Sequence, residues 1–196
     1  VFSSRTGNIY TTSLLLQWLQ WAFGIKPVPE EIWEKGGRFY DPFRPRVEPD
    51  GFASVEELRA SQQQTLKSFR ESVTQADVFV FTLGLTETWC HEATGTVYPT
   101  APGVIGTPDA PQDVSFRNDG HRAIMADLEA LNSFGQSRNP NFKLLLTVSP
   151  VPLTATGTGG HVLPATTYSK SVLRSAAGEF ARGHDNVDYF PSYEII

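Results

Sequence analysis

Three short apolar runs that alternate with helical segments constrain the fold of this chain more than any other feature. They cover residues 77–81, 143–148 and 187–190. The first run is β-branched and aromatic and has no helical spacing, which is typical of a central strand in a parallel sheet. Strand, loop, helix and strand then follow one another along the chain. This order predicts a three-layer α/β/α fold built on a parallel sheet.

Four segments have the apolar spacing of helices that bury one face. They cover residues 11–23, residues 54–76, a stretch that starts near residue 119, and residues 166–182. Ser54 and Glu57 form a capping box at the start of the second segment. Gly24 is placed to end the first segment.

Two stretches rich in proline and glycine separate these elements, at residues 26–51 and 91–117. Proline and glycine at this density do not sustain a regular helix or a central strand, so both stretches are predicted to be irregular. The aromatic residues of the first stretch need burial, which indicates an ordered excursion rather than a linker. Loops of this length usually carry function.

The composition favours one folded domain over residues 1–196. The chain has 196 residues, of which 40% are apolar, and no repeat or charged block divides it. Its formal net charge is −5 and it has no run of lysine or arginine, so a nucleic-acid partner is not expected.

Cysteine content and hydropathy limit the other classes. A single cysteine, Cys90, excludes an internal disulfide framework and a cysteine-based zinc site. No apolar stretch approaches the roughly 20 residues that cross a bilayer, so no membrane partner is expected. No metal or cofactor is expected either. The compartment and the oligomeric state are left open, although a reduced cytoplasm is compatible.

The segment Thr82-Leu83-Gly84-Leu85-Thr86-Glu87-Thr88-Trp89 follows the first apolar run directly. It places a glycine, a hydroxyl and a carboxylate just beyond a buried strand. In α/β enzymes, ligands bind outside the carboxyl ends of the strands. Gly84, Thr86 and Glu87 are therefore candidates for a site at the rim of the sheet.

Several ordered motifs together carry a resemblance to a known family. TLGLTETW, SPVPLTAT from Ser149, YSKSVLR from Tyr168, DYFPSYEI from Asp188, GNIYTT at Gly7 and DPFRPR at Asp41 are similar to segments of the GSCFA domain family, a branch of the SGNH hydrolases. The resemblance implies a flavodoxin-like sheet of the SGNH type. The family's Gly-Ser-Cys-Phe-Ala block and a later Asp-x-x-His segment do not occur in this sequence. It is therefore interpreted as a fragment incomplete at both ends, with nucleophile and base outside this chain.

The resemblance also implies a candidate oxyanion hole, formed by Thr86, Gly84 and Gly7. Thr86 stands where the SGNH motif has an asparagine whose side chain donates to the tetrahedral oxyanion. Gly7 precedes the first helix and resembles the glycine of the second SGNH motif. The alternatives are that Thr86 and Glu87 only cap a turn, and that Asn8 or Thr11 is only a helix N-cap.

Five residues are candidates for substrate binding: Glu87, Asn8, Asp41, Arg44 and His161. The Arg44 guanidinium suits a bidentate clamp on a carboxylate or on sugar oxygens, but an internal pair with Asp41 that pins the loop explains the motif at least as well. His161 follows the SPVP segment and is either near the site or a solvated loop residue. None of the four histidines is assigned as the base of a catalytic triad.

The function expected from the resemblance is that of a serine esterase of the SGNH type. It would cleave O-acyl esters, preferably of carbohydrates, through an acyl-enzyme and without a cofactor. Two alternatives remain: an O-acyltransferase on the same fold, and a non-catalytic carbohydrate-binding or interaction module.

Overall fold

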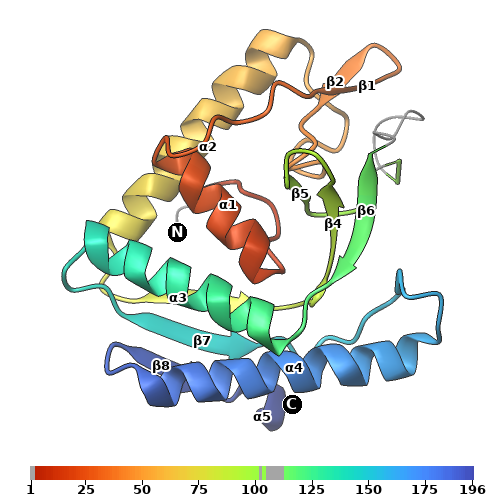
Figure 1. Ribbon diagram of the computed structural model, residues 1–196. Coiled ribbons are helices and arrows are strands. Elements are labelled where there is room, and N and C mark those ends of the chain that lie inside the picture. Colours follow the sequence, from red (N-terminus) through yellow and green to blue (C-terminus); the bar gives the residue numbers. More distant parts are fainter. Residues whose placement is uncertain (1–2, 102, 105–112) are drawn as a thin grey trace.

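A computed structural model describes residues 3–101, 103–104 and 113–196 of the chain (Figure 1). The helices are α1 (Thr12–Ala22), α2 (Val55–Gln75), α3 (His121–Arg138), α4 (Val162–Gly183) and α5 (Ser192–Ile195). The strands are β1 (Trp33–Lys35), β2 (Arg38–Tyr40), β3 (Phe79–Leu83), β4 (Glu87–His91), β5 (Val97–Tyr98), β6 (Val114–Asn118), β7 (Leu144–Val148) and β8 (Val187–Phe190). No helix within the described residues is long and apolar enough to span a bilayer.

The three apolar runs form one parallel sheet in the order β3-β7-β8. Helix α3 connects β3 to β7 and α4 connects β7 to β8, as expected for crossover connections between parallel strands. Helices α3 and α4 pack against each other, and α4 packs on β7 and β8. The predicted α/β class with a parallel sheet is confirmed, and it is compatible with a three-layer arrangement.

One face of the parallel sheet carries the core and the other is largely bare. Phe81, Leu146 and Tyr189 are in register on the core face. On the opposite face, Val80 is 58% exposed and Phe190 is 51% exposed. Among the described helices, only the short α5 lies on this face, where the Ser192 hydroxyl donates to the carbonyl of Val148. A third layer would lie on this bare face.

The two stretches predicted to be irregular contain strands, so that prediction was wrong for their described parts. In the first, β1 and β2 form an antiparallel hairpin, and Gly36 and Gly37 between them have φ values of 59° and 72°. Positive φ at both central positions is the mark of a type I′ turn. The second contributes to an antiparallel sheet of order β5-β4-β6. Residues 102 and 105–112 of that stretch lie outside the described residues.

Helix α1 lies at the centre of the view in Figure 1 and contacts α2, α3 and β5. It starts at its N-cap Thr11, whose hydroxyl accepts from the Leu14 amide, and it ends just before Gly24, which has φ 69°. Trp33 and Phe43 of the first excursion stack with Tyr98 of β5. The excursion is therefore ordered, as predicted, and it packs on the second sheet.

Candidate functional site

Three cavities meet at Tyr10, beside the carboxyl ends of β3 and β7. We call them the Trp89 cavity (about 270 Å³), the Arg46 cavity (about 460 Å³) and the Pro152 cavity (about 270 Å³), each after one lining residue. Tyr10 lines all three and is 39% exposed. This is the edge of the sheet at which the sequence placed the candidate site.

The backbone of Tyr10 ties the start of α1 to the end of β3. Its carbonyl accepts from the amides of Gly84 (2.9 Å) and Leu85 (3.1 Å). A Cβ atom at position 84 would lie 2.9 Å from Cδ1 of the Tyr10 ring. Glycine is therefore required at position 84 because the Tyr10 ring packs directly against the backbone.

Other elements hold the same turn from its remaining sides. Lys170 of α4 donates through Nζ to the Gly84 carbonyl at 2.8 Å, and the Thr86 amide donates to Ser169 Oγ at 3.2 Å. The Asp119 amide donates to the Thr86 carbonyl at 2.8 Å. The polar groups of the peptide unit between Gly84 and Leu85 are thus bonded on both sides, which fixes the rim before any ligand binds.

Sequence reasoning did not assign Ser169 and Lys170 to the rim. Both are buried, and they lie on the face of α4 that also buries Leu173 and Ala177. Lys170 is four residues before Arg174 on a helical surface, which favoured a solvated pair. The sequence did contain a sign of this burial. Lys170 lies three residues before Leu173 and seven before Ala177, which places it within the apolar face of the helix.

The buried Lys170 gives a testable pH dependence of stability. Burial lowers the pKa of Lys170 from 10.5 to about 8 in the folded protein. Between these values the unfolded chain binds more protons, so raising the pH through this window favours the folded state. We expect the wild type to gain stability relative to Lys170→Met between about pH 7 and about pH 10, as measured by urea unfolding.

The exposed Lys143 provides a matched control for this measurement. The variant Lys143→Met should follow the wild type across the same pH range. The other ionisable groups are the same in the wild type and in each variant, so their contributions cancel in the comparison. Parallel pH profiles for the wild type and Lys170→Met would contradict the assignment of a desolvated cation beneath Gly84.

The three candidate oxyanion donors have different environments. The Gly84 amide is already bonded to the Tyr10 carbonyl, and Gly84 lines the Pro152 cavity. The Thr86 side chain is 1% exposed, and its buried hydroxyl has no partner among the described residues. Gly7 has φ 69° and lines the Arg46 cavity. The structure therefore brings Gly7 and Gly84 to the cavities around Tyr10, whereas Thr86 lies beneath the rim.

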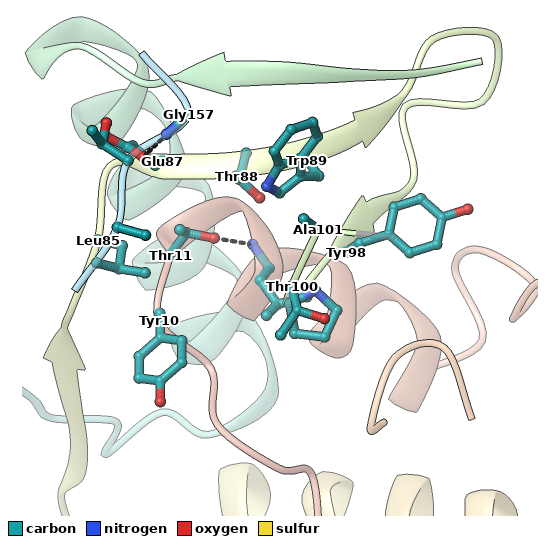
Figure 2. Close-up of a pocket in the computed structure, with 14 residues that line it drawn as sticks. Tyr10, Thr11, Leu85, Glu87, Thr88, Trp89, Tyr98, Thr100, Ala101 and Gly157 are labelled. Atoms are coloured by element: carbon teal, nitrogen blue, oxygen red, sulfur yellow. Dashed lines mark hydrogen bonds between the residues drawn. The ribbon is translucent and has the colours of Figure 1, made fainter. Parts of the chain in front are cut away.

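Glu87 and Asn8 both lie at the cavities. The Thr156 hydroxyl donates to Glu87 Oε1 at 2.6 Å and the Gly157 amide donates to Oε2 at 3.0 Å, as Figure 2 shows for the second bond. Glu87 thus holds the loop after β7 against the Trp89 cavity. Asn8 lines the Arg46 cavity, where its side-chain amide donates to the Tyr10 hydroxyl.

Asp41 and Arg44 form an internal pair, which was the alternative left open by the sequence. Arg44 Nε lies 2.8 Å from Asp41 Oδ2, and neither side chain is exposed. Arg44 also donates to Thr65 Oγ1 of α2 at 2.6 Å. The structure therefore favours the internal pair over a guanidinium clamp on a substrate, because the Arg44 and Asp41 charges face each other inside the protein.

His161 is the N-cap of α4 and lines none of the three cavities. Its Nδ1 accepts from the Leu163 amide at 3.1 Å, and the residue is exposed. Ser169, which bonds the Thr86 amide at the rim, lies eight residues further along α4. Eight residues correspond to about 12 Å along a helix axis. The structure therefore favours the solvated alternative.

The side chains of the four histidines interact with groups other than serine within the described residues. His91 accepts from the Ala93 amide, and His161 accepts from the Leu163 amide. His121 pairs with Glu179. His184 contacts both Glu129 and the Phe180 carbonyl. No group of three or more described His, Cys, Asp or Glu side chains is placed to hold a metal ion. Polar and aromatic side chains line the three cavities around Tyr10, and these are the groups that a ligand would contact there.

The model of the GSCFA family matches residues 1–196, the whole chain. A search of curated proteins found no match.

Proposed function

Because the chain belongs to the GSCFA family, whose motifs resemble those of SGNH hydrolases, we propose that the natural protein hydrolyses O-acyl esters of carbohydrates. The observation that carries the proposal is the convergence at Tyr10. The segments that resemble GSCFA motifs and contain Gly7, Gly84 and Ser149 all reach the walls of the cavities around this residue. A ligand at this rim lies where α/β enzymes bind theirs.

The lining of the Trp89 cavity favours a sugar. Tyr10 and Trp89 supply aromatic surface and Thr88 and Thr100 lie beside them (Figure 2), and Thr156 also lines this cavity. Sugars present apolar ring faces and many hydroxyls, so aromatic and hydroxyl walls together suit them. The volume of about 270 Å³ is just below the usual lower limit of about 300 Å³ for ligand pockets and suits one sugar ring.

The proposed reaction proceeds through an acyl-enzyme. The serine of the Gly-Ser-Cys-Phe-Ala block attacks the acyl carbon, a histidine transfers the serine proton to the leaving sugar oxygen, and water then releases the acid. The residues of this chain bind the sugar and stabilise the oxyanion. Thr86 is the donor proposed for the second task because its hydroxyl has no partner among the described residues, although this hydroxyl is buried beneath the rim and lines none of the three cavities.

A labelling experiment on the natural protein tests the proposal. A fluorophosphonate probe should label one serine, and the protein should release acetate from acetylated monosaccharides. A folded protein that is neither labelled nor hydrolytic would exclude the esterase. Transfer of the acetyl group to an added sugar, at a rate above hydrolysis, would instead identify an O-acyltransferase.

The variant Thr86→Val tests the oxyanion role. Valine keeps the shape of threonine and removes a buried hydroxyl without a partner, so the free energy of unfolding should be unchanged or slightly higher. Loss of an oxyanion donor should lower turnover by at least about tenfold. The exposed Thr158→Val is the control and should keep full turnover. Unchanged esterase turnover in Thr86→Val would remove Thr86 from the oxyanion hole.

The second candidate function is a non-catalytic carbohydrate-binding module. It is favoured by the environment of the candidate donors, because the Gly84 amide is bonded to Tyr10 and the Thr86 side chain is buried. This function predicts that the natural protein binds sugars without labelling or hydrolysis. Sugar binding can be followed by the fluorescence of Trp89, which lines the cavity and is partly exposed.

A further inference from the structure

The Arg46 cavity is basic although the chain as a whole is acidic. The formal net charge of the chain is −5, yet the residues that line this cavity include Arg44 and Arg46 and no aspartate or glutamate. The remaining polar side chains of the lining are those of Asn8, Tyr10, Thr100 and Thr154. The cavity thus has an unusual concentration of hydrogen-bond donors.

The open charge of this cavity belongs to Arg46. The guanidinium of Arg44 is buried, its Nε pairs with Asp41 at 2.8 Å, and its Nη2 has no partner among the described residues. Arg46 is exposed, and it takes part in none of the ion pairs among the described residues. An anionic group that enters the cavity would therefore find one uncompensated cation.

A rigid turn presents Arg46 to the cavity. The Val47 amide donates to the Arg44 carbonyl at 3.0 Å, which places Pro45 and Arg46 at the two central positions of a turn. Proline at the first central position fixes φ in advance. The turn is anchored by the buried Arg44–Asp41 pair, and Asp41 Oδ1 also accepts from the Phe43 amide at 2.9 Å. The buried Arg44–Asp41 pair thus fixes the backbone that carries Arg46. A fixed backbone loses less conformational entropy when a ligand binds.

Tyr10 connects this cavity to the Trp89 cavity. Its ring lines both, and its hydroxyl accepts from Asn8, so the hydroxyl proton remains available for a ligand oxygen. Thr100 also lines both cavities. One ligand can therefore place a sugar ring against Trp89 and a charged substituent beside Arg46.

We propose that Arg46 binds a carboxylate of the ligand, so that the carbohydrate recognised at Tyr10 is an acidic sugar. This inference rests on the proposed carbohydrate ligand and assigns its charge. A carboxylate fits better than a phosphate because its single negative charge matches the single open guanidinium, which can bind both carboxylate oxygens. Arg46 is then the arginine of the DPFRPR motif whose uncompensated charge meets the ligand.

Equilibrium binding to the natural protein tests the proposal with D-glucuronate, D-glucose and D-glucose 6-phosphate as probes. We expect D-glucuronate to bind at least about tenfold more tightly than D-glucose, since a charge-assisted bidentate pair is stronger than a neutral hydrogen bond. It should also bind more tightly than D-glucose 6-phosphate, whose second negative charge meets no second open cation. The preference should weaken as salt is added. Calorimetry or NMR titration gives the three dissociation constants.

Variants of Arg46 separate the charge from its geometry. In Arg46→Ala the preference for D-glucuronate over D-glucose should disappear, whereas Arg46→Lys should keep part of it because the charge remains and the bidentate fork is lost. Arg122→Ala on α3, which removes an exposed arginine outside the cavities, should behave like the wild type. Circular dichroism confirms that each variant is folded.

Two results would overturn the proposal: equal affinity for D-glucuronate and D-glucose in the wild type, or an unchanged preference in Arg46→Ala. A preference for D-glucose 6-phosphate would overturn the assignment of a carboxylate. The esterase assay is independent of this measurement. A protein that binds D-glucuronate through Arg46 and releases no acetate would disprove the esterase and retain the acidic ligand.

Discussion

Replacement of Asp41 with alanine is expected to lower the free energy of unfolding by about 3–5 kcal/mol. The variant leaves the Arg44 guanidinium buried without its carboxylate partner, which lies at 2.8 Å in the wild type. It also removes the acceptor of the Phe43 amide. An uncompensated charge inside a protein is destabilising because desolvation is no longer offset by a partner. Urea unfolding followed by circular dichroism measures the difference.

Two further variants test whether the buried charge is the cause. Glu48→Ala in the same loop removes a carboxylate that pairs with Arg5 at the surface, and it should change stability by no more than about 1 kcal/mol. The double variant Asp41→Ala, Arg44→Met removes both charges and should recover a large part of the loss, because no charge remains buried. A cost below about 1 kcal/mol for Asp41→Ala would show that the loop relaxes and hydrates Arg44.

The parallel sheet and its helices were predictable because their signals are local and continuous. The strand β7 is a short run of three leucines followed by two β-branched residues. Helix α2 begins at the capping box of Ser54 and Glu57, whose hydrogen bonds the structure contains. Such elements are specified within a window of a few residues. The alternation of strands and helices then leaves few topologies, of which the parallel sheet is the simplest.

The second sheet was missed because its pairing is not local. Strand β4 pairs with β6, and Glu87 is in register with Asn118 across a long loop. Strand β5 has two residues and no periodicity to detect. Proline and glycine between these strands were read as evidence against regular structure, whereas here they separate short strands whose partners are distant in sequence. Tertiary pairing overrides local composition in such cases.

The location of the cavities around Tyr10 was predictable, and the contacts of the residues that line them were not. The end of β3 follows from the strand pattern, and Gly7, Asn8, Gly84 and Glu87 do line the cavities at Tyr10. Tyr10 itself was not predicted, because an aromatic residue before a helix resembles any packing residue. The sequence also does not distinguish a buried arginine from an open one two residues away. That distinction depends on where the Asp41 carboxylate lies.

Gly84 illustrates how a motif and a structure assign different reasons to the same residue. The resemblance to SGNH hydrolases presents this glycine as part of an oxyanion hole. In the structure its amide is bonded to the Tyr10 carbonyl, and the absence of a side chain is what allows the Tyr10 ring to approach. The two explanations predict different effects of alanine at this position. Alanine keeps the backbone amide that an oxyanion hole would use, but its methyl group would prevent the close approach of the Tyr10 ring.

We therefore expect Gly84→Ala to displace Tyr10, lower the free energy of unfolding by about 1–3 kcal/mol and weaken sugar binding by at least about tenfold. The added methyl group would lie 2.9 Å from Tyr10 Cδ1 and 3.3 Å from both Tyr10 Cβ and the Tyr10 carbonyl oxygen. The first contact involves the ring alone, so Tyr10→Ala should relieve part of the strain. In a double-mutant cycle, the two substitutions should then destabilise the protein by less than the sum of their separate effects.

Gly183→Ala is the matched control for this cycle, because a Cβ at position 183 meets nothing within 4 Å. This substitution at the end of α4 should leave stability unchanged or raise it by up to about 1 kcal/mol. If Gly84→Ala were as harmless as Gly183→Ala, the Tyr10 ring would move without cost. The walls shared by the three cavities would then be adaptable, and the rigid rim on which both the esterase proposal and the acidic-ligand proposal depend would be disproved.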